Sequence, residues 1–136
     1  MANKRIMLID DEVGFTSLVK LNLERTGHFA VCVVNNPLAA LATARTFMPH
    51  LILLDVMMPD KTGGELLAEI EGDAQLKDVP VMFLTASTVG QVARAQHTAA
   101  HGRPVIAKPV DPKELIRHID EVLGRSFFGL RLNWDK

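Results

Sequence analysis

The sequence contains few of the residues that often mark a special class of protein. It has no tyrosine, one tryptophan and a single cysteine, Cys32. One cysteine cannot form an internal disulfide, so we expect Cys32 to be a small core residue in a reducing compartment, the cytoplasm. The chain also lacks an apolar leader segment and any run of roughly 18 apolar residues, so it predicts neither a signal peptide nor a membrane span.

An excess of charge of either sign is also missing. The chain has 15 Lys and Arg residues against 16 Asp and Glu residues, for a formal net charge of −1. Proteins that bind nucleic acid or an anionic membrane usually carry a basic excess, so we expect no direct binding to either. With 136 residues, 48% of them hydrophobic, the chain has the size and composition of one ordinary globular domain.

Five short apolar runs recur along the chain and are nearly continuous rather than alternating. This pattern is typical of strands in a parallel sheet that is covered on both faces. The runs are 5–9, 30–34, 51–54, 79–84 and 104–107.

Helical stretches separate these runs, so strand and helix alternate five times. We expect helices over 12–26, from Asn36 onward, over about 63–71, over about 88–100, and from Asp111 onward. The alternation predicts an α/β fold with a doubly wound, five-stranded parallel sheet and helices on both faces. The core-facing residues expected on four of these helices are Phe15, Leu18, Val19 and Leu23; Leu38, Leu41 and Ala42; Leu66, Leu67 and Ile70; and Leu115, Ile116, Ile119 and Leu123.

Polar residues follow all five predicted strands, and at four of them they are candidate site residues. Ligands of open parallel sheets bind beyond the carboxyl ends of the strands, so these residues are expected to share one edge. The second strand is followed by Asn35 and Asn36, which we interpret as helix-capping residues. The other strand ends carry Asp10, Asp11 and Glu12; Asp55; Thr85, Ala86 and Ser87; and Lys108.

This set of residue types suits phosphoryl transfer. Carboxylates brought together repel one another, and Mg²⁺ relieves that repulsion because it prefers oxygen ligands. Lys108 offers a cation and Thr85 a hydroxyl to a phosphoryl oxygen. Asp55 is then the natural nucleophile, because a carboxylate can form an aspartyl-phosphate.

Each of these residues also has a simpler interpretation when taken alone. An acidic pair before a helix often compensates the helix dipole, and a lone Asp after a strand is usually a turn residue. A Lys before Pro is most often solvated, and a Thr after a strand is most often a helix cap. The joint occurrence of all four types at one edge favours the functional interpretation.

Four motifs resemble the receiver domain of two-component response regulators. They are "LIDDE" at 8–12, "LLDVMMPDKTGGEL" at 53–66, "FLTAS" at 83–87 and "AKPVD" at 107–111. The resemblance covers roughly residues 4–124. It implies a flavodoxin-like, CheY-like sheet with strand order 2-1-3-4-5.

The resemblance also implies roles for the site residues. Asp55 would accept a phosphoryl group from a sensor histidine kinase or a histidine phosphotransfer protein. Mg²⁺ would be held by Asp11, Asp55 and the backbone carbonyl of Met57, with Asp10 acting through water. Lys108 would contact the phosphoryl group. The domain would catalyse only its own phosphorylation and dephosphorylation, without turnover of an external substrate.

The resemblance further implies a conformational switch that a downstream protein reads. Thr85 would move toward the phosphoryl group and shift the loop after it, which amounts to a change in population between two existing arrangements. The predicted helix 88–100 has the thinnest apolar face, as expected of a mobile element. Val105 and Val110 replace aromatic residues common in the family, so the output face formed by the fourth helix, fifth strand and fifth helix should be read differently.

The domain organisation and the alternatives complete these expectations. Residues 1–124 would form the receiver domain, and 125–136 an apolar tail without an effector domain; a homodimer through the output face is one expected assembly. A phosphatase of the haloacid dehalogenase type would need a second Asp where Met57 stands, and an acidic "DDE" would repel a flavin phosphate. The remaining alternative is a pseudo-receiver that binds proteins without phosphorylation.

Overall fold

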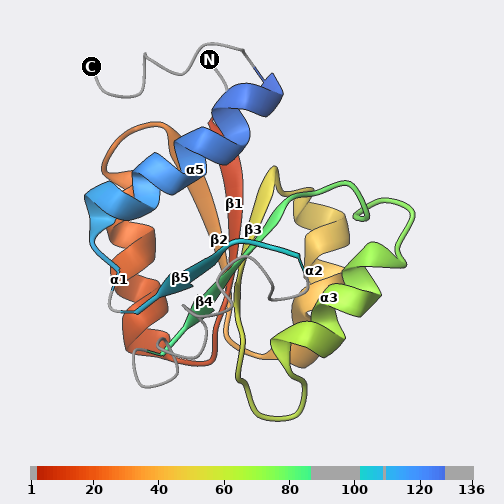
Figure 1. Cartoon of the computed structure of the whole chain (residues 1–136). Helices are drawn as coiled ribbons and strands as arrows, with labels where there is room; N and C mark the ends of the chain where they lie inside the picture. The colour runs from red at the N-terminus through yellow and green to blue at the C-terminus, as the bar shows by residue number, and fades with distance from the viewer. Residues whose placement is uncertain (1–2, 87–101, 109, 128–136) are drawn as a thin grey trace.

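A computed structural model describes residues 3–86, 102–108 and 110–127 of the chain. Its centre is one five-stranded sheet in which every pairing is parallel, with the order β2-β1-β3-β4-β5 (Figure 1). This confirms the predicted fold class and strand order, and each strand begins within a residue or two of its predicted position. The strands are β1 (Lys4–Ile9), β2 (Phe29–Val34), β3 (Leu51–Asp55), β4 (Val81–Thr85) and β5 (Val105–Ala107).

Helices cover both faces of the sheet. Helices α1 and α5 lie on one face and α2 and α3 on the other (Figure 1). The expected helix over 88–100 lies outside the described residues. None of the helices in the described ranges is long and apolar enough to cross a membrane. The helices are α1 (Val13–Glu24), the 3-10 turn η1 (Pro37–Ala39), α2 (Ala40–Phe47), α3 (Gly63–Glu71) and α5 (Pro112–Phe127).

The apolar runs are continuous because alternate residues of each strand enter two different cores. In β1, Met7 and Ile9 pack toward α2 and α3, whereas Ile6 and Leu8 pack toward α1 and α5. All four side chains are fully buried. Burial of a side chain of this size stabilises the fold by about 1.5–3 kcal/mol. A sheet with two cores therefore leaves only the strand ends for polar side chains.

The predicted helix faces are correct for α3 and α5 and partly wrong for the other two helices. Leu18 and Leu38 are more than half exposed, and Ala40 and Ala44 form the buried side of α2. The chain after Asn36 opens with a 3-10 turn, which changes the angular spacing of the side chains before α2 begins. In α1, the stripe through Thr16, Val19 and Leu23 faces the sheet, and Leu18 lies beside that stripe.

Candidate functional site

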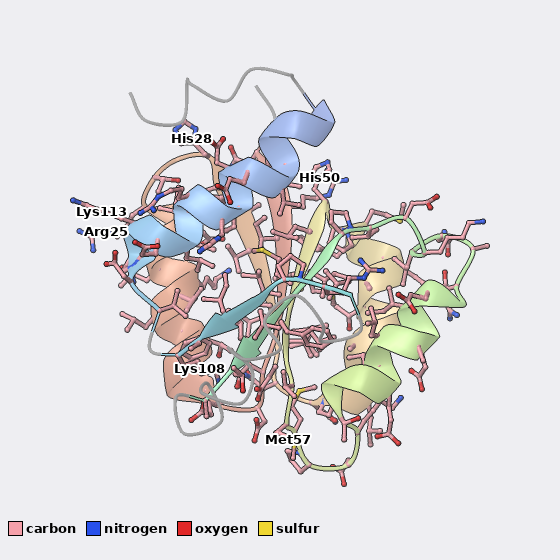
Figure 2. The ribbon with its side chains drawn as sticks, viewed as in Figure 1. Arg25, His28, His50, Met57, Lys108 and Lys113 are labelled. Carbon is pink, nitrogen blue, oxygen red and sulfur yellow. The ribbon has the colours of Figure 1, made fainter. Side chains whose placement is uncertain are left out.

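The predicted site residues come together at the carboxyl end of the sheet. Figure 2 shows Lys108 and Met57 at this end and His50, which precedes β3, at the opposite end. The strand register places Asp55 beside Leu84 of β4, and Thr85 beside Ala107 of β5. The backbone N–H of Lys108 donates to the carbonyl of Thr85 at 2.7 Å, which fixes the segment after β5 to the end of β4.

Three carboxylates form the acidic part of the site. Oxygen atoms of Asp10, Asp11 and Asp55 lie within 4.8 Å of one another, and Asp10 and Asp55 are buried. Burial and the negative charge of Asp10 raise the pKa of Asp55 to about 7, against the opposing effect of Lys108. Burial likewise raises the pKa of Asp10. The cluster, which we call the acid cluster, therefore disfavours its own full ionisation and attracts positive charge.

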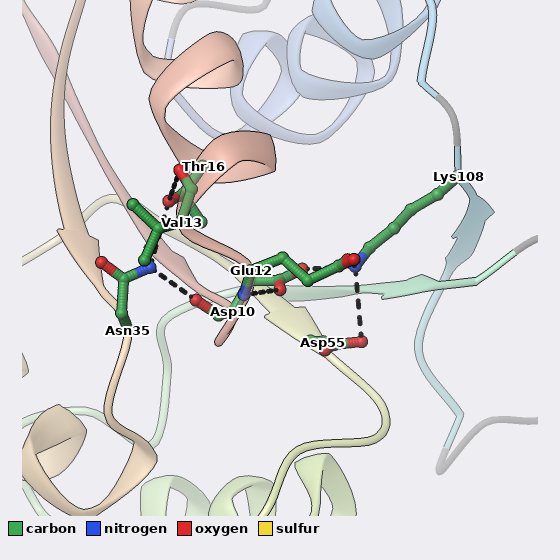
Figure 3. A network of polar contacts seen from close by, with 7 residues as sticks. All are labelled: Asp10, Glu12, Val13, Thr16, Asn35, Asp55 and Lys108. Carbon is green, nitrogen blue, oxygen red and sulfur yellow. Dashed lines mark hydrogen bonds and ion pairs between the residues drawn. The ribbon is translucent and has the colours of Figure 1, made fainter.

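Lys108 supplies the positive charge but contacts Asp55 least closely. Its Nζ lies 2.6 Å from Asp10 Oδ2 and 2.6 Å from Glu12 Oε1, but 3.9 Å from Asp55 Oδ1 (Figure 3). The ring of Phe15 adds a cation–π contact, with its centroid 4.4 Å from Nζ. Burial acts to lower the pKa of Lys108, but the hydrogen bonds to Asp10 and Glu12 outweigh it and raise the pKa. The lysine therefore remains a cation.

The segment between β1 and α1 is held by Asn35, whose role differs from the prediction. Its Nδ2 donates to the carbonyl of Asp10 at 2.8 Å and to Thr16 Oγ1 at 3.0 Å (Figure 3). Asn36 is the helix cap that was expected, because its Oδ1 accepts the backbone N–H of Leu38 at 3.0 Å. Asn35 thus braces the acid cluster from β2. Its position at the same strand edge as the acidic residues is the sequence signal that could have indicated this.

Thr85 and Met57 contribute differently exposed groups to this edge. Thr85 is almost fully buried, and its hydroxyl oxygen has no hydrogen-bond partner among the residues that the structure describes. Met57 as a residue is 63% exposed, while its backbone N–H donates to the Asp55 carboxylate and acts to lower that carboxyl's pKa. Ser87 lies outside the described residues.

The structure explains why the first glycine of the "MPDKTGG" motif, Gly63, is required. It is the first residue of α3, and its N–H donates to the carbonyl of Val56 at 2.8 Å. A Cβ at this position would lie 2.5 Å from the Asp55 carbonyl oxygen and 3.1 Å from the ring of Phe83. Only glycine allows α3 to begin directly against the end of β3. The backbone that carries Asp55 is therefore set by this close approach.

The donor set has the chemistry of a site for a hard divalent cation. Its three carboxylates supply only oxygen ligands, and two of them are buried with raised pKa values that a cation would reverse. Mg²⁺ is commonly bound by one or two carboxylates together with waters, so the acid cluster fits it. Asp10, Asp11 and Asp55 are the side chains that could hold it.

Comparison of the sequence with known proteins gives the family that the four sequence motifs resemble. Residues 6–120 match the model of the response regulator receiver domain. Response regulator Rre1 of Synechocystis sp. is 32% identical over 122 residues, covering 89% of this chain and 52% of the relative. A CpxR homolog of Haemophilus influenzae, a transcriptional regulatory protein, is 37% identical over 122 residues, covering 90% and 51%. The chain thus spans about half the length of these relatives.

A solved structure agrees in fold. The receiver domain of sensor histidine kinase PA1611 from Pseudomonas aeruginosa superposes with a TM-score of 0.78 at 26% identity, over 90% of this chain and 99% of that chain. That structure holds a magnesium ion coordinated in its active site cleft. With the family match over most of its length and the sheet order in agreement, this chain belongs to the receiver domains of two-component response regulators.

Proposed function

We propose that this domain accepts a phosphoryl group on Asp55 from a phosphohistidine of a sensor kinase or phosphotransfer protein, in a reaction that requires Mg²⁺. The observation that carries the proposal is the placement of Asp55 itself. It is a buried carboxylate with a raised pKa, at the end of β3, between two other carboxylates and a lysine cation. A purely structural aspartate would not need three charged neighbours.

In the proposed reaction an Asp55 carboxylate oxygen attacks phosphorus. The O–P bond forms as the P–N bond of the phosphohistidine breaks, and the histidine nitrogen leaves with the electron pair and takes up a proton. Bound Mg²⁺ would neutralise the charge of the acid cluster and of the phosphoryl oxygens. Asp11, Asp55 and the backbone carbonyl of Met57 would hold the ion, and Asp10 would reach it through water.

Lys108 and Thr85 are the proposed switch residues. The Lys108 ammonium lies 3.9 Å from Asp55 and moves a short way to reach a phosphoryl oxygen on it. The Thr85 hydroxyl, buried and without a partner among the described residues, is a donor available for the same group. Its movement would shift the segment that follows β4, which a downstream protein then reads.

Exposed apolar side chains border the site and support a protein as the phosphoryl donor. Val13 begins α1, Leu38 lies in η1 and Met57 follows β3, so all three stand at the carboxyl ends of neighbouring strands. Each is about 60% exposed. A protein surface that covers the acid cluster would bury these side chains as well, whereas a small phosphate donor would leave them in water.

The extent of the domain and its output stay predictions. Residues 1–124 would be the receiver and 125–136 the tail, most of which lies outside the described residues. The relatives are longer than this chain, so the remaining proposals concern this domain alone. We propose that it forms a homodimer through the output face, that a downstream protein reads it, and that it turns over no external substrate.

The test is intact-mass spectrometry after incubation with acetyl phosphate, with and without Mg²⁺. We expect the parent to gain one phosphoryl group only with Mg²⁺, and Asp55→Asn to gain none. Asp60→Asn is the matched control, because Asp60 is exposed, lies five positions away on the loop after β3 and has a positive φ that asparagine tolerates. Phosphorylation of Asp55→Asn at the parental level would refute the acceptor assignment. A parent that neither gains mass nor binds beryllofluoride with Mg²⁺ would instead be a phosphorylation-independent binding module.

A further inference from the structure

Glu12 is an exposed residue with a buried partner. Its side chain is 61% exposed, yet its Oε1 lies 2.6 Å from the Nζ of Lys108, a side chain that is only 9% exposed. Glu12 is also the residue that precedes the first turn of α1, where an acidic side chain often caps the helix. It makes no such capping hydrogen bond, and its carboxylate is directed at the lysine instead (Figure 3).

Both oxygens of the neighbouring Asp10 carboxylate are already engaged. Asp10 Oδ1 accepts the backbone N–H of Glu12 at 2.9 Å, and Oδ2 lies 2.6 Å from the lysine Nζ. A divalent cation that enters the acid cluster repels the ammonium and needs the negative charge of Asp10 for itself. The contact between Lys108 and Asp10 is then weakened, because Asp10 would also reach the ion through water. An ammonium left without a partner at such a buried position is strongly unfavourable.

Only one of the lysine's carboxylate neighbours stands outside the acid cluster. Among the described residues, Asp10, Glu12 and Asp55 lie within ion-pair distance of Nζ, and two of these belong to the cluster. The ring of Phe15 offers a weaker contact at 4.4 Å. Glu12 is therefore the partner that a cation in the cluster does not compete for.

We propose that Glu12 is a positioning residue that holds Lys108 when Mg²⁺ occupies the acid cluster, so that the metal and the lysine are accommodated together. The inference rests on the proposed function, because it requires Mg²⁺ to bind among the three aspartates. Glu12 itself touches neither the metal nor the phosphoryl group. Its effect on Mg²⁺ binding passes through Lys108.

The test is a double-mutant cycle in which the dissociation constant of Mg²⁺ alone is measured by calorimetry. The variants are Glu12→Gln, Lys108→Met and the two combined, which separates a contact with the lysine from a general loss of negative charge. We expect Glu12→Gln to weaken Mg²⁺ binding about fivefold, which corresponds to the upper range for a partly exposed ion pair. In the Lys108→Met background, where no ammonium needs a partner, the same substitution should change the constant by less than about twofold.

Glu121→Gln is the matched charge control. Glu121 is an exposed carboxylate in the later half of α5, and its contact is with His118 on the same helix. The later part of α5 lies toward the end of the sheet away from the site (Figure 1). The Glu121→Gln substitution removes one negative charge and should leave the Mg²⁺ affinity at the parental value. A similar loss for Glu121→Gln would show that net charge alone is responsible and would overturn the proposal.

Two further results would overturn the inference while leaving the proposed function intact. One is an unchanged Mg²⁺ affinity in Glu12→Gln, and the other is an equal loss in the presence and absence of Lys108. A parent that binds no Mg²⁺ would overturn the proposed function and this inference with it. If Lys108→Met does not fold, the side-chain NMR signals of Lys108 decide. At saturating Mg²⁺ its Nζ protons should stay protected in the parent and exchange quickly in Glu12→Gln; equal protection in both would refute the proposal.

Discussion

At the scale of single residues, the site is a balance between a lysine and the carboxylates around it. The cation sits closest to Asp10 and Glu12, so Asp55 keeps a raised pKa despite a positive charge nearby. The backbone of this arrangement is held from β2, where Asn35 donates to the carbonyl of Asp10 and to Thr16. Because the Asn35 amide is neutral, it positions this backbone without adding a charge that would shift the pKa values of Asp10, Asp55 and Lys108.

Asn35→Ala should therefore weaken both the fold and the site. The carbonyl of Asp10 and the buried hydroxyl of Thr16 each lose a donor, which should lower the free energy of unfolding by about 1–3 kcal/mol. Mg²⁺ affinity should fall as well, because the segment carrying Asp10 and Asp11 is no longer braced. Chemical denaturation and calorimetry measure the two effects.

Asn36→Ala is the control for that substitution. It removes only the cap contact to the N–H of Leu38, with an expected cost of about 1 kcal/mol and no change in Mg²⁺ affinity. Equal Mg²⁺ affinities for the Asn35 and Asn36 variants would show that Asn35 supports the fold and has no part in the site.

The residues of the site also show what could be predicted from the sequence and what could not. The aspartates, Thr85 and Lys108 could be assigned to one edge because each follows an apolar run, and parallel strands end together. The ion pair between Glu12 and Lys108 could not be predicted, because it depends on how α1 starts relative to the segment after β5. Side-chain direction at such a contact is decided by tertiary packing.

At the scale of elements, the close approach of α3 to β3 fixes the position of the backbone that carries Asp55. Thr62 and Glu65 form a capping box at the start of α3, with the Thr62 hydroxyl accepting from the N–H of Glu65 at 3.1 Å and the Glu65 carboxylate accepting from the N–H of Thr62 at 2.8 Å. The bounds of α3 match the 63–71 expected from the apolar face of Leu66, Leu67 and Ile70, whereas the capping box was not part of that prediction. The face of α2 was less predictable, because the turn at Pro37 shifts the helix that follows.

Gly63→Ala is the substitution that tests this approach. The new methyl group would meet the Asp55 carbonyl oxygen at 2.5 Å, so the end of β3 or the start of α3 must move. We expect a loss of about 1–3 kcal/mol in the free energy of unfolding, together with altered NMR shifts at Asp55 and slower phosphorylation.

Gly72→Ala provides the comparison at the other end of the same helix. Its Cβ would make only ordinary van der Waals contact, 3.4 Å from the Ala68 carbonyl oxygen, and its φ of −87° suits any residue. This variant should be neutral or slightly more stable, by up to about 1 kcal/mol, with normal phosphorylation. If the two variants behave alike, the close approach at Gly63 does not control Asp55.

At the scale of the whole molecule, α2 and the turn after α3 are tied by a charge pair far from the acid cluster. Arg45 lies 2.6 Å from Asp73 Oδ2, and Asp73 Oδ1 accepts the backbone N–H of Gln75 at 2.9 Å. The hydrogen bond from Arg45 is the main reason that the pKa of Asp73 lies below its usual 3.8. A carboxyl whose pKa is lower in the folded state stabilises the fold above its unfolded pKa and loses that contribution as pH falls through the folded pKa.

Asp73→Asn should accordingly have a pH-dependent cost. At pH 7 the variant should melt at a lower temperature than the parent, because the ion pair and the turn contact are weakened. The difference should narrow once the pH falls below 3.8 and the parental carboxyl takes up its proton. Melting curves across this range measure it, and a difference that is constant with pH would show that Asp73 acts through its shape and not its charge.

The strand order has a consequence for the order in which the protein is made. The acid cluster is complete in the chain once Asp55 has been synthesised, whereas the lysine that offsets it comes directly after β5, the last strand, at the edge of the sheet. A ribosome-bound chain that ends before β5 therefore carries Asp10 and Asp55, which are buried in the finished domain, without the Lys108 cation that pairs with them. Such a chain must take up protons or a metal ion, or keep the ends of β1 and β3 hydrated and undocked. In the absence of a metal ion, we expect this edge of the domain to close at neutral pH only after Lys108 has left the exit tunnel.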